Sequence, residues 1–162
     1  MSKLSPYRSL PPERRIALLT HAIKSSREAR ALYISRIVSR GGGFRTVTFQ
    51  SWAPDRLARE VIRMKAESAQ DEFDLLQMLY VDLEPAIQIT FLDAAGVKHA
   101  EGKMEESLEA PYADAESVMR AAVVVIEKHG PDGLHYLRTI ARYSQDGWPG
   151  IAALVSGLEI AT

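Results

Sequence analysis

Arginine is the residue type in this chain with the most evident capacity to bind a partner. A guanidinium group can bind phosphate through two hydrogen bonds and can stack on a nucleic-acid base. Aromatic residues that suit stacking lie among the arginines: Tyr33, Phe44, Phe49 and Trp52. The arginines that could neutralise phosphates in this way are Arg14, Arg15, Arg27, Arg30, Arg36, Arg40, Arg45, Arg56, Arg59 and Arg63.

Five of these arginines occupy unusual surroundings. Arg27 and Arg30 fall on a helical stripe that is otherwise apolar, and Arg36, Arg40 and Arg45 lie around a run of three glycines. A glycine-rich loop bracketed by arginines can follow a phosphate backbone. We therefore predict that these five residues form any surface that binds a protein partner or a polyanion.

The two halves of the chain carry opposite charge. Residues 1–65 contain 14 Lys+Arg and four acidic residues, a formal charge of +10. Residues 66–162 contain 6 Lys+Arg and 17 Asp+Glu, a formal charge of −11. Such asymmetry indicates either an anionic partner or two surfaces that attract each other. We favour pairing within the protein or between subunits, because nucleic-acid-binding domains usually carry a net positive charge.

Histidine and carboxylate groups are densest at His99, Glu101, Glu105 and Glu106. Imidazole and carboxylate oxygens could bind a divalent metal or perform acid–base chemistry. The spacing matches no helical ligand motif such as His-Glu-x-x-His, and residues 97–111 have the polarity of a loop. We therefore predict no metal and no cofactor, and keep a site near His99 as an alternative.

A second carboxylate group extends over one predicted helix and its end: Asp71, Glu72, Asp74, Asp82 and Glu84. The first three occupy the helix start, where acids normally interact with the helix dipole. The chain lacks the Glu-x-x-His partner that a di-iron bundle needs. No catalytic residue is predicted from these acids.

The N-terminal elements, which position these side chains, are predicted to be helices. Pro11-Pro12 starts a helix, and a break is expected near Lys24–Ser26, where Ser25 and Glu28 offer a capping box. A second helix should continue to about Arg40. The alternative is a β-hairpin that pairs residues 31–39 with 44–50, and residues 44–49 are expected to be extended in either case.

Proline, glycine and capping residues mark the later helices. Helices are expected after Pro54 and over residues 69–83, 85–95, 114–129 and 131–143, with a last short helix that opens at Pro149. The helix over 114–129 is apolar on nearly every side, a pattern typical of a central, buried helix.

The expected fold is therefore all-α, a single compact domain over residues 1–162 made of about seven short helices, with residues 1–11 as an N-terminal extension. The absence of cysteine favours a reducing, cytoplasmic location. The longest apolar run, Ala121–Ile126, is too short to span a bilayer, so no membrane partner is expected.

Three functional hypotheses follow. The first is a non-enzymatic helical protein that associates with itself or with another protein, because charge asymmetry and surplus apolar surface suit an oligomer. The second is a nucleic-acid-binding accessory protein that uses the N-terminal arginines. The third is an enzyme or small-ligand binder with a site between helices near His99.

Overall fold

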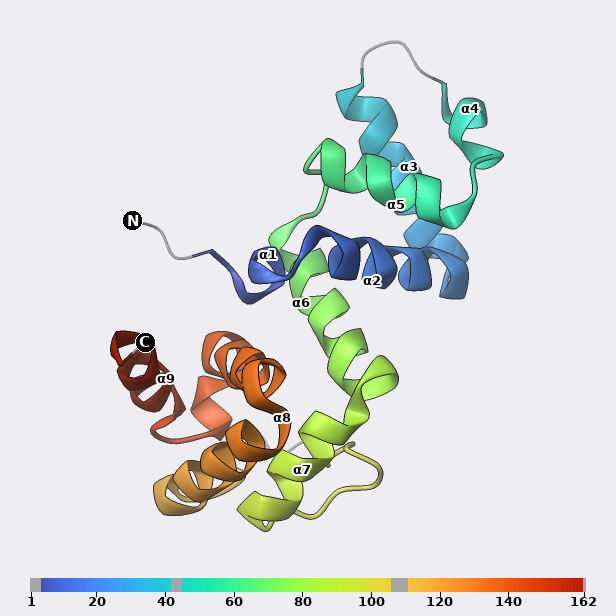
Figure 1. Ribbon diagram of the computed structural model, residues 1–162. Helices are drawn as coiled ribbons and strands as arrows, with labels where there is room; N and C mark the ends of the chain where they lie inside the picture. Colours follow the sequence, from blue (N-terminus) through green and yellow to red (C-terminus); the bar gives the residue numbers. More distant parts are fainter. Residues whose placement is uncertain (1–3, 42–44, 106–110, 162) are drawn as a thin grey trace. The chain divides into compact units, whose positions relative to one another are not determined.

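The computed structural model (Figure 1) describes residues 4–41, 45–105 and 111–161. Within these residues all regular structure is helical, with nine α-helices, one π-helical segment, one 3-10 segment and no strand. The prediction of an all-α fold is confirmed. The chain divides into two compact units, unit 1 over Met1–Leu75 and unit 2 over Leu76–Thr162. The assignment of residues 1–162 to one domain stays a prediction.

Unit 1 begins with three helices: α1 (Pro6–Ser9), α2 (Pro12–Ser25) and α3 (Arg27–Arg40). The segment expected to be an N-terminal extension contains α1, whose Tyr7 is fully buried. The break between α2 and α3 lies where the sequence predicted it. Its capping residue differs, because Ser26, not Ser25, accepts a hydrogen bond from the backbone N–H of Ala29.

The hairpin alternative is wrong for the described residues. Residues 31–39 lie inside α3, and the segment expected to be extended forms α4 (Thr46–Gln50). Phe44 lies outside the described residues. Helix α4 forms because Phe49 is buried and packs edge-on against Trp52, with 4.7 Å between ring centroids. Tertiary packing thus overrides the strand propensity of a short β-branched segment.

Helix α5 (Pro54–Arg63) begins with proline in its first turn, as predicted. It packs against α2, and both helices also contact α3 (Figure 1). The core of unit 1 comes from the apolar faces of these helices: Leu18, Leu19, Ile23, Tyr33, Ile34, Ile37, Leu57, Ala58 and Val61.

Helix α6 (Ala69–Met78) starts with the predicted capping box. The backbone N–H of Asp71 donates to Ser68 Oγ, and the backbone N–H of Ser68 donates to the Asp71 carboxylate at 2.7 Å. The unit boundary falls inside α6, after Leu75. The helix ends in a π-helical segment, η1 (Leu79–Leu83), so the predicted range 69–83 is helical throughout.

Unit 2 continues with α7 (Pro85–Ala95), which has the predicted bounds. Gly96 ends it in the left-handed region, with φ of 72°. The backbone N–H of Val97 then donates to the Leu92 carbonyl at 2.9 Å. This is the terminal glycine motif that the sequence indicated.

Helix α8 (Ala115–Tyr143) consists of two limbs that meet at Gly130. Asp114 caps the first limb by accepting from the backbone N–H of Ser117 at 2.7 Å. Gly130 is not helical, with φ of 55° and ψ of −130°, and Pro131 starts the second limb. The predicted break between residues 129 and 131 is confirmed.

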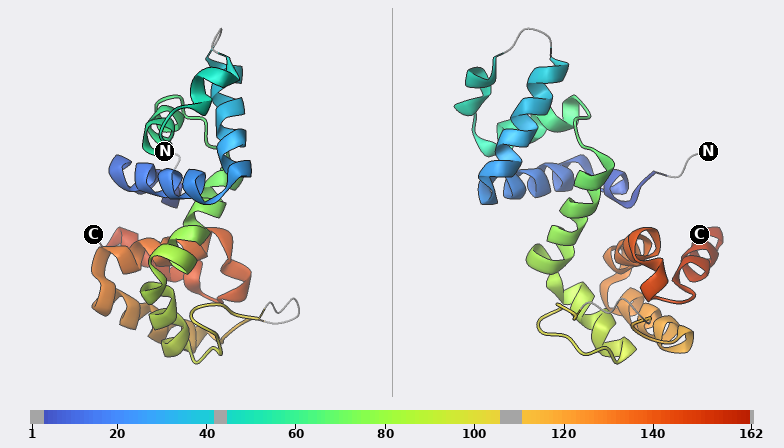
Figure 2. Two further views of the ribbon diagram at one scale, coloured as in Figure 1. Left: turned by 90° about the vertical axis from the view of Figure 1, so that its right-hand side faces the viewer. Right: turned by 180° about the vertical axis from the view of Figure 1, so that it is seen from behind.

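Helix α9 (Ile151–Ile160) completes unit 2 and begins two residues after the predicted Pro149. Both α7 and α9 pack against α8 (Figure 2). A chain of aromatic rings fills the core, from Tyr80 to Tyr136, Phe91 and Trp148, with centroid separations of 5.0, 5.6 and 4.9 Å. Each contact is edge-on, the arrangement that aromatic quadrupoles favour.

Candidate functional site

Arg30 binds the backbone of unit 1. Its Nη2 donates to the carbonyl oxygens of Gln50, at 2.9 Å, and Trp52, at 2.7 Å. These carbonyls lie at the C-terminal end of α4, where unsatisfied acceptors and the helix dipole both favour a cation. The arginine that interrupts the apolar stripe of α3 therefore holds the end of a neighbouring helix.

Arg40 has the same role at the end of α5. Its Nη1 donates to the carbonyl oxygens of Met64, at 3.1 Å, and Lys65. Met64 is the C-terminal cap of α5. Lys65 has a positive φ of 50°, so the chain turns sharply here. The turn leaves the carbonyl oxygens of Met64 and Lys65 able to accept hydrogen bonds from Arg40.

Arg36 joins α3 to the start of α6. Its Nη1 forms an ion pair with the Asp71 carboxylate and donates to the Ala66 carbonyl at 3.3 Å. Its guanidinium also lies 5.8 Å from the centre of the Tyr33 ring. Asp71 is buried, so Arg36 compensates a charge that has lost its water.

The remaining two predicted arginines are placed differently. Arg27 and Arg45 are both exposed, and Arg45 directly precedes α4. Residues 42–44 lie outside the described residues, and so does most of the predicted glycine loop. Of the five arginines singled out in the sequence, three donate to the unit 1 backbone and two face solvent.

Two buried glutamates near the start of α6 have their partners in α1. Glu72 accepts from Arg8 Nε at 2.6 Å, and Glu67 accepts from the Tyr7 hydroxyl at 3.0 Å. Both glutamates are buried. The sequence placed Glu72 in an ordinary helix-start position, and what it missed is the burial and the partner 64 residues earlier in the chain.

Tyr7 acts as a hydrogen-bond donor in this cluster. Burial, together with the charge of Glu67 and the hydrogen bond to it, raises the pKa of Tyr7 far above its ordinary value. The Arg15 guanidinium, 6.0 Å from the ring centre, acts in the opposite direction and is the weakest influence. Tyr7 thus stays protonated at neutral pH and stabilises the Glu67 carboxylate.

A row of exposed arginines lies along α5. Arg56, Arg59 and Arg63 are three and four residues apart and so share one helical side; we call these three residues the arginine face. The Arg56 guanidinium lies 3.8 Å from the centre of the Trp52 ring. Arg63 pairs with Glu60, and its hydrogen bonds lower the pKa of that carboxyl group. The spacing was visible in the sequence, but the stacking on Trp52 was not.

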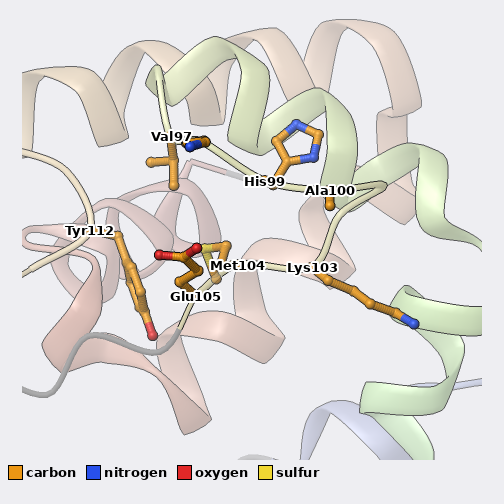
Figure 3. Close-up of a pocket in the computed structure, with 8 residues that line it drawn as sticks. Val97, His99, Ala100, Lys103, Met104, Glu105 and Tyr112 are labelled. Carbon is orange, nitrogen blue, oxygen red and sulfur yellow. The ribbon is translucent and has the colours of Figure 1, made fainter.

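A pocket of about 540 Å³ lies at the segment that follows α7 (Figure 3). A concave site near His99 is what the small-ligand hypothesis requires. Figure 3 shows the Glu105 carboxylate directed toward Tyr112, and the Lys103 side chain directed away. The lining residues are Val97, Lys98, His99, Ala100, Lys103, Met104, Glu105 and Tyr112.

Both ring nitrogens of His99 are already engaged. The backbone N–H of Gly102 donates to Nδ1 at 3.0 Å, so the ring proton lies on Nε2, which donates to Asp93 Oδ1 at 2.8 Å. The side chain is only 12% exposed. His99 therefore offers no free lone pair to a substrate or metal, and its evident role is to hold the turn that follows.

That turn has the geometry of a two-residue hairpin turn. Ala100 and Lys103 exchange backbone hydrogen bonds of 2.9 and 3.0 Å. Glu101 and Gly102 between them have positive φ values of 52° and 86°, as a type I′ turn requires. Gln88 of α7 donates to the Gly102 carbonyl at 2.6 Å. Glu101 is thus part of a turn and not of a ligand set.

The other histidines of unit 2 are also bound. His129 Nε2 lies 3.0 Å from Thr90 Oγ1 at the end of the first limb of α8. His135 is buried, and its Nδ1 is hydrogen-bonded to the Tyr80 hydroxyl. Each imidazole therefore joins α8 to an earlier helix.

The first limb of α8 exposes an apolar strip. Met119, Val123 and Val124 are 59%, 49% and 37% exposed. Four exposed charged residues lie on the same limb: Glu116, Arg120, Glu127 and Lys128. The sequence predicted a central, buried helix with a narrow polar strip at Arg120 and Glu127. The exposed face is wider than predicted, because the three apolar residues also face solvent. We call Met119, Val123 and Val124 the apolar strip.

Two absences within the described residues bear on the kind of site. In the described part of the chain, no three His, Asp or Glu residues are grouped as metal ligands would be; Glu106 lies outside that part. Of the helices in the same residues, none combines the length and apolarity needed to cross a membrane.

Comparison with known proteins gives no relative. No protein-family model, no curated protein and no solved structure matches this chain.

Proposed function

We propose that this protein is a non-enzymatic helical protein that acts by binding a second copy of itself, with unit 1 of one copy against unit 2 of the other. Charge supports the proposal. Unit 1 contains 14 Lys+Arg and eight Asp+Glu, a formal charge of +6. Unit 2 contains 6 Lys+Arg and 13 Asp+Glu, a formal charge of −7. Complementary charge orients partners and speeds their encounter.

The apolar strip is the observation that carries the proposal. Three neighbouring apolar side chains on one helix face lose their contact with water if a partner covers them. Full burial of a completely exposed side chain of this kind is worth about 1.5–3 kcal/mol, and each of these three, which are 37% to 59% exposed, would gain about half of that. The exposed charges on the same limb, Glu116, Arg120, Glu127 and Lys128, sum to zero, so the preference for a basic partner comes from the net charge of unit 2 as a whole.

A twofold axis would repeat the contact between unit 1 of one copy and unit 2 of the other. If unit 1 of each copy meets unit 2 of the other, the two contacts are related by a twofold axis and the dimer is closed. No further copy can then add to it. A closed dimer of this kind is the product we propose, whereas a contact that does not close would add copy after copy and give a mass above that of a dimer.

The chemistry of the titratable groups supports a non-enzymatic role. Both nitrogens of His99 are hydrogen-bonded, and Tyr7 is held protonated. The buried acids Asp71 and Glu72 are ion-paired. None of these groups is available as a general base. The cysteine-free composition favours a cytoplasmic location for this association.

The test is the mass of the protein as a function of concentration and salt. Multi-angle light scattering in about 50 mM salt should give a mass approaching twice the 18.0 kDa of the chain. In about 500 mM salt the charge attraction is screened, and the mass should fall toward that of the monomer. A monomer at every concentration in low salt contradicts the proposal.

A nucleic-acid-binding role has one specific observation in its favour. Arg56 stacks on Trp52, and Arg45 and Arg59 are exposed in the same unit. Binding of a single-stranded oligonucleotide should then weaken steeply with salt. Replacing these three arginines with alanine should reduce it further, whereas Arg142→Ala in unit 2 should not. Unchanged affinity of the triple variant excludes this role.

A further inference from the structure

We infer that the first limb of α8 lies on the twofold axis of the proposed dimer, packed antiparallel against the same limb of the second copy. This inference rests on the proposed self-association. It adds the surface that covers the apolar strip and the residue pairs that fix the direction and register of the contact.

The exposed side of this limb is continuous along the helix. Its residues recur as neighbouring pairs every three or four positions, which keeps them on one side over about four turns. Such a side can lie along a second helix over its whole length. The exposed residues are Ala115, Glu116, Met119, Arg120, Val123, Val124, Glu127 and Lys128.

The charges on this side are available to a partner. In the described part of the chain, no ion pair includes Glu116, Arg120, Glu127 or Lys128. Arg120 donates to the hydroxyl of Ser117 at 3.2 Å, a neutral partner on the same helix. A surface that covers the strip must therefore also match two acids and two bases.

The order of these residues is complementary to its own reverse. Arg120 and Glu127 lie at equal distances from the midpoint between the two exposed valines. In an antiparallel pair centred there, Arg120 of each copy lies opposite Glu127 of the other. Val123 then lies opposite Val124, so two ion pairs enclose an apolar centre. A parallel pair in register would instead place like charges opposite each other.

The outer residues fit the same register. Met119 of one copy lies opposite Lys128 of the other, whose aliphatic stem can cover the thioether. The ammonium group then extends toward Glu116, which is one helical turn beyond Met119. Each of the four charged residues thus has a partner of opposite sign in the second copy.

The local pairs act against a weaker long-range repulsion. Each copy of unit 2 carries a formal charge of −7, so two of them repel each other. Salt screens that repulsion over about 8 Å at physiological ionic strength, whereas the paired groups lie in contact. The attraction of unit 2 to unit 1 of the other copy, which carries +6, also offsets it.

Charge reversal within one chain tests this contact. Arg120→Glu places a carboxylate opposite Glu127 of the second copy, and Glu127→Arg places a guanidinium opposite Arg120. Each single variant should dimerise at least about tenfold more weakly than wild type, because the like-charge pair occurs twice. Arg120→Glu/Glu127→Arg restores both ion pairs with reversed direction and should dimerise within about threefold of wild type.

Net charge alone predicts a different pattern. Arg120→Glu makes unit 2 more negative and Glu127→Arg makes it less negative, so an attraction to unit 1 alone would respond in opposite directions. The combined variant has the net charge of wild type. Weakening by both single variants with recovery in the combined variant therefore supports the axial contact.

Disulfide trapping tests the position of the axis. The chain contains no cysteine, so a single Val123→Cys substitution reports one site. This position lies next to the axis, and oxidation should give a disulfide-linked dimer on a non-reducing gel. Ile160→Cys is the control, because Ile160 is 87% exposed on α9 and outside the contact. Circular dichroism of each variant in high salt shows that it is folded.

The outcomes separate this inference from the proposed function. If wild type dimerises but the combined variant stays as weak as the single variants, the axis lies elsewhere and self-association stands. Cross-linking of Ile160→Cys as fast as Val123→Cys likewise overturns the inference. A wild-type protein that is monomeric in low salt overturns self-association itself.

Discussion

Glu67 of unit 1 is a buried carboxylate whose hydrogen-bond donor is Tyr7. It is 5% exposed, Oε1 accepts from the Tyr7 hydroxyl, and Oε2 has no hydrogen-bond partner among the described residues. Tyr7→Phe removes the donor and leaves a buried carboxylate with less compensation. We expect a loss of about 1–3 kcal/mol in the free energy of unfolding, measured by urea denaturation.

A double-mutant cycle shows whether that loss comes from the hydrogen bond. Replacing Glu67 with methionine in the Tyr7→Phe background removes the stranded acceptor as well. The double variant should then be more stable than Tyr7→Phe alone, because two apolar groups need no hydrogen bond. Additive losses from the two substitutions would contradict this account.

Arg30 and Arg27 are close in sequence and have different roles. Arg30 donates to two carbonyl oxygens at the end of α4, whereas Arg27 is exposed. Arg30→Met should lower the free energy of unfolding by about 1–3 kcal/mol. Arg27→Met should change it by less than about 0.5 kcal/mol. Equal effects in urea denaturation would mean that the contacts of Arg30 contribute nothing to stability.

Tyr33 makes the stability of unit 1 depend on alkaline pH. Burial raises its pKa to about 12, above the ordinary value of 10.0, because the phenolate would lose its water. The unfolded chain therefore loses this proton first, and stability falls as pH rises from 10 toward 12. Below pH 10 this contribution is complete.

The measurement is urea denaturation at a series of pH values above 9. Between about pH 10 and pH 11, Tyr33 should account for a loss of about 1 kcal/mol. The Tyr33→Phe variant should lose correspondingly less over this interval. The buried Tyr7 and Tyr136 also have raised pKa values and keep part of the slope. An identical slope in the variant would contradict the assignment.

Among the helices of unit 2, two glycines should respond in opposite ways to substitution by alanine. A Cβ on Gly133, in the second limb of α8, would lie 2.5 Å from the Val125 carbonyl oxygen of the first limb. Gly133→Ala should therefore force the limbs apart and destabilise the protein by about 1–3 kcal/mol. A Cβ on Gly157 in α9 meets open space, and Gly157→Ala should stabilise by about 0.5–1 kcal/mol.

Each of the two glycine substitutions serves as the control for the other. Both change glycine to alanine within a helix, so intrinsic helix propensity favours alanine in both. Thermal denaturation should nevertheless shift in opposite directions. A rise in melting temperature for both variants would show that the limbs of α8 can separate without penalty.

Helix boundaries with a local chemical cause were predictable from sequence. Pro85 with Gly96, Asp114, and the break at Gly130 all act within a few residues of the boundary they set. The short α4 was missed because its reason to form is the burial of Phe49, which only the folded unit supplies. The residues near a helix boundary carry no information about contacts with residues that are distant in the sequence.

The candidate site was less predictable for the same reason. The sequence identified unusual arginines, but not that Arg36 meets Asp71 or that Arg40 meets carbonyls 24 and 25 residues away. The apolar surplus of residues 114–129 was visible. Which of its valines is buried depends on how α7 and α9 cover α8, and three-dimensional packing alone decides that.

In the whole molecule, the opposite charges of the two chain halves are partly compensated by local ion pairs. Part of the positive charge of residues 1–65 is compensated inside unit 1 by buried acids of α6. The charge that remains, +6 on unit 1 and −7 on unit 2, is a property of two compact units and not of isolated residues. A nearly neutral chain with two charged units attracts a second copy most strongly at low ionic strength.

Association of this kind should make thermal stability depend on protein concentration. A partner that binds only the folded state stabilises it by mass action, and a hundredfold rise in concentration is worth about 2.7 kcal/mol. For a dimer of this chain length we expect the melting temperature to rise by about 3–5 °C over that range in low salt. In about 500 mM salt the concentration dependence should disappear, and Met119→Ser/Val123→Ser should abolish it in low salt as well. A melting temperature independent of concentration in low salt would mean that the two charged units act on something other than a second copy.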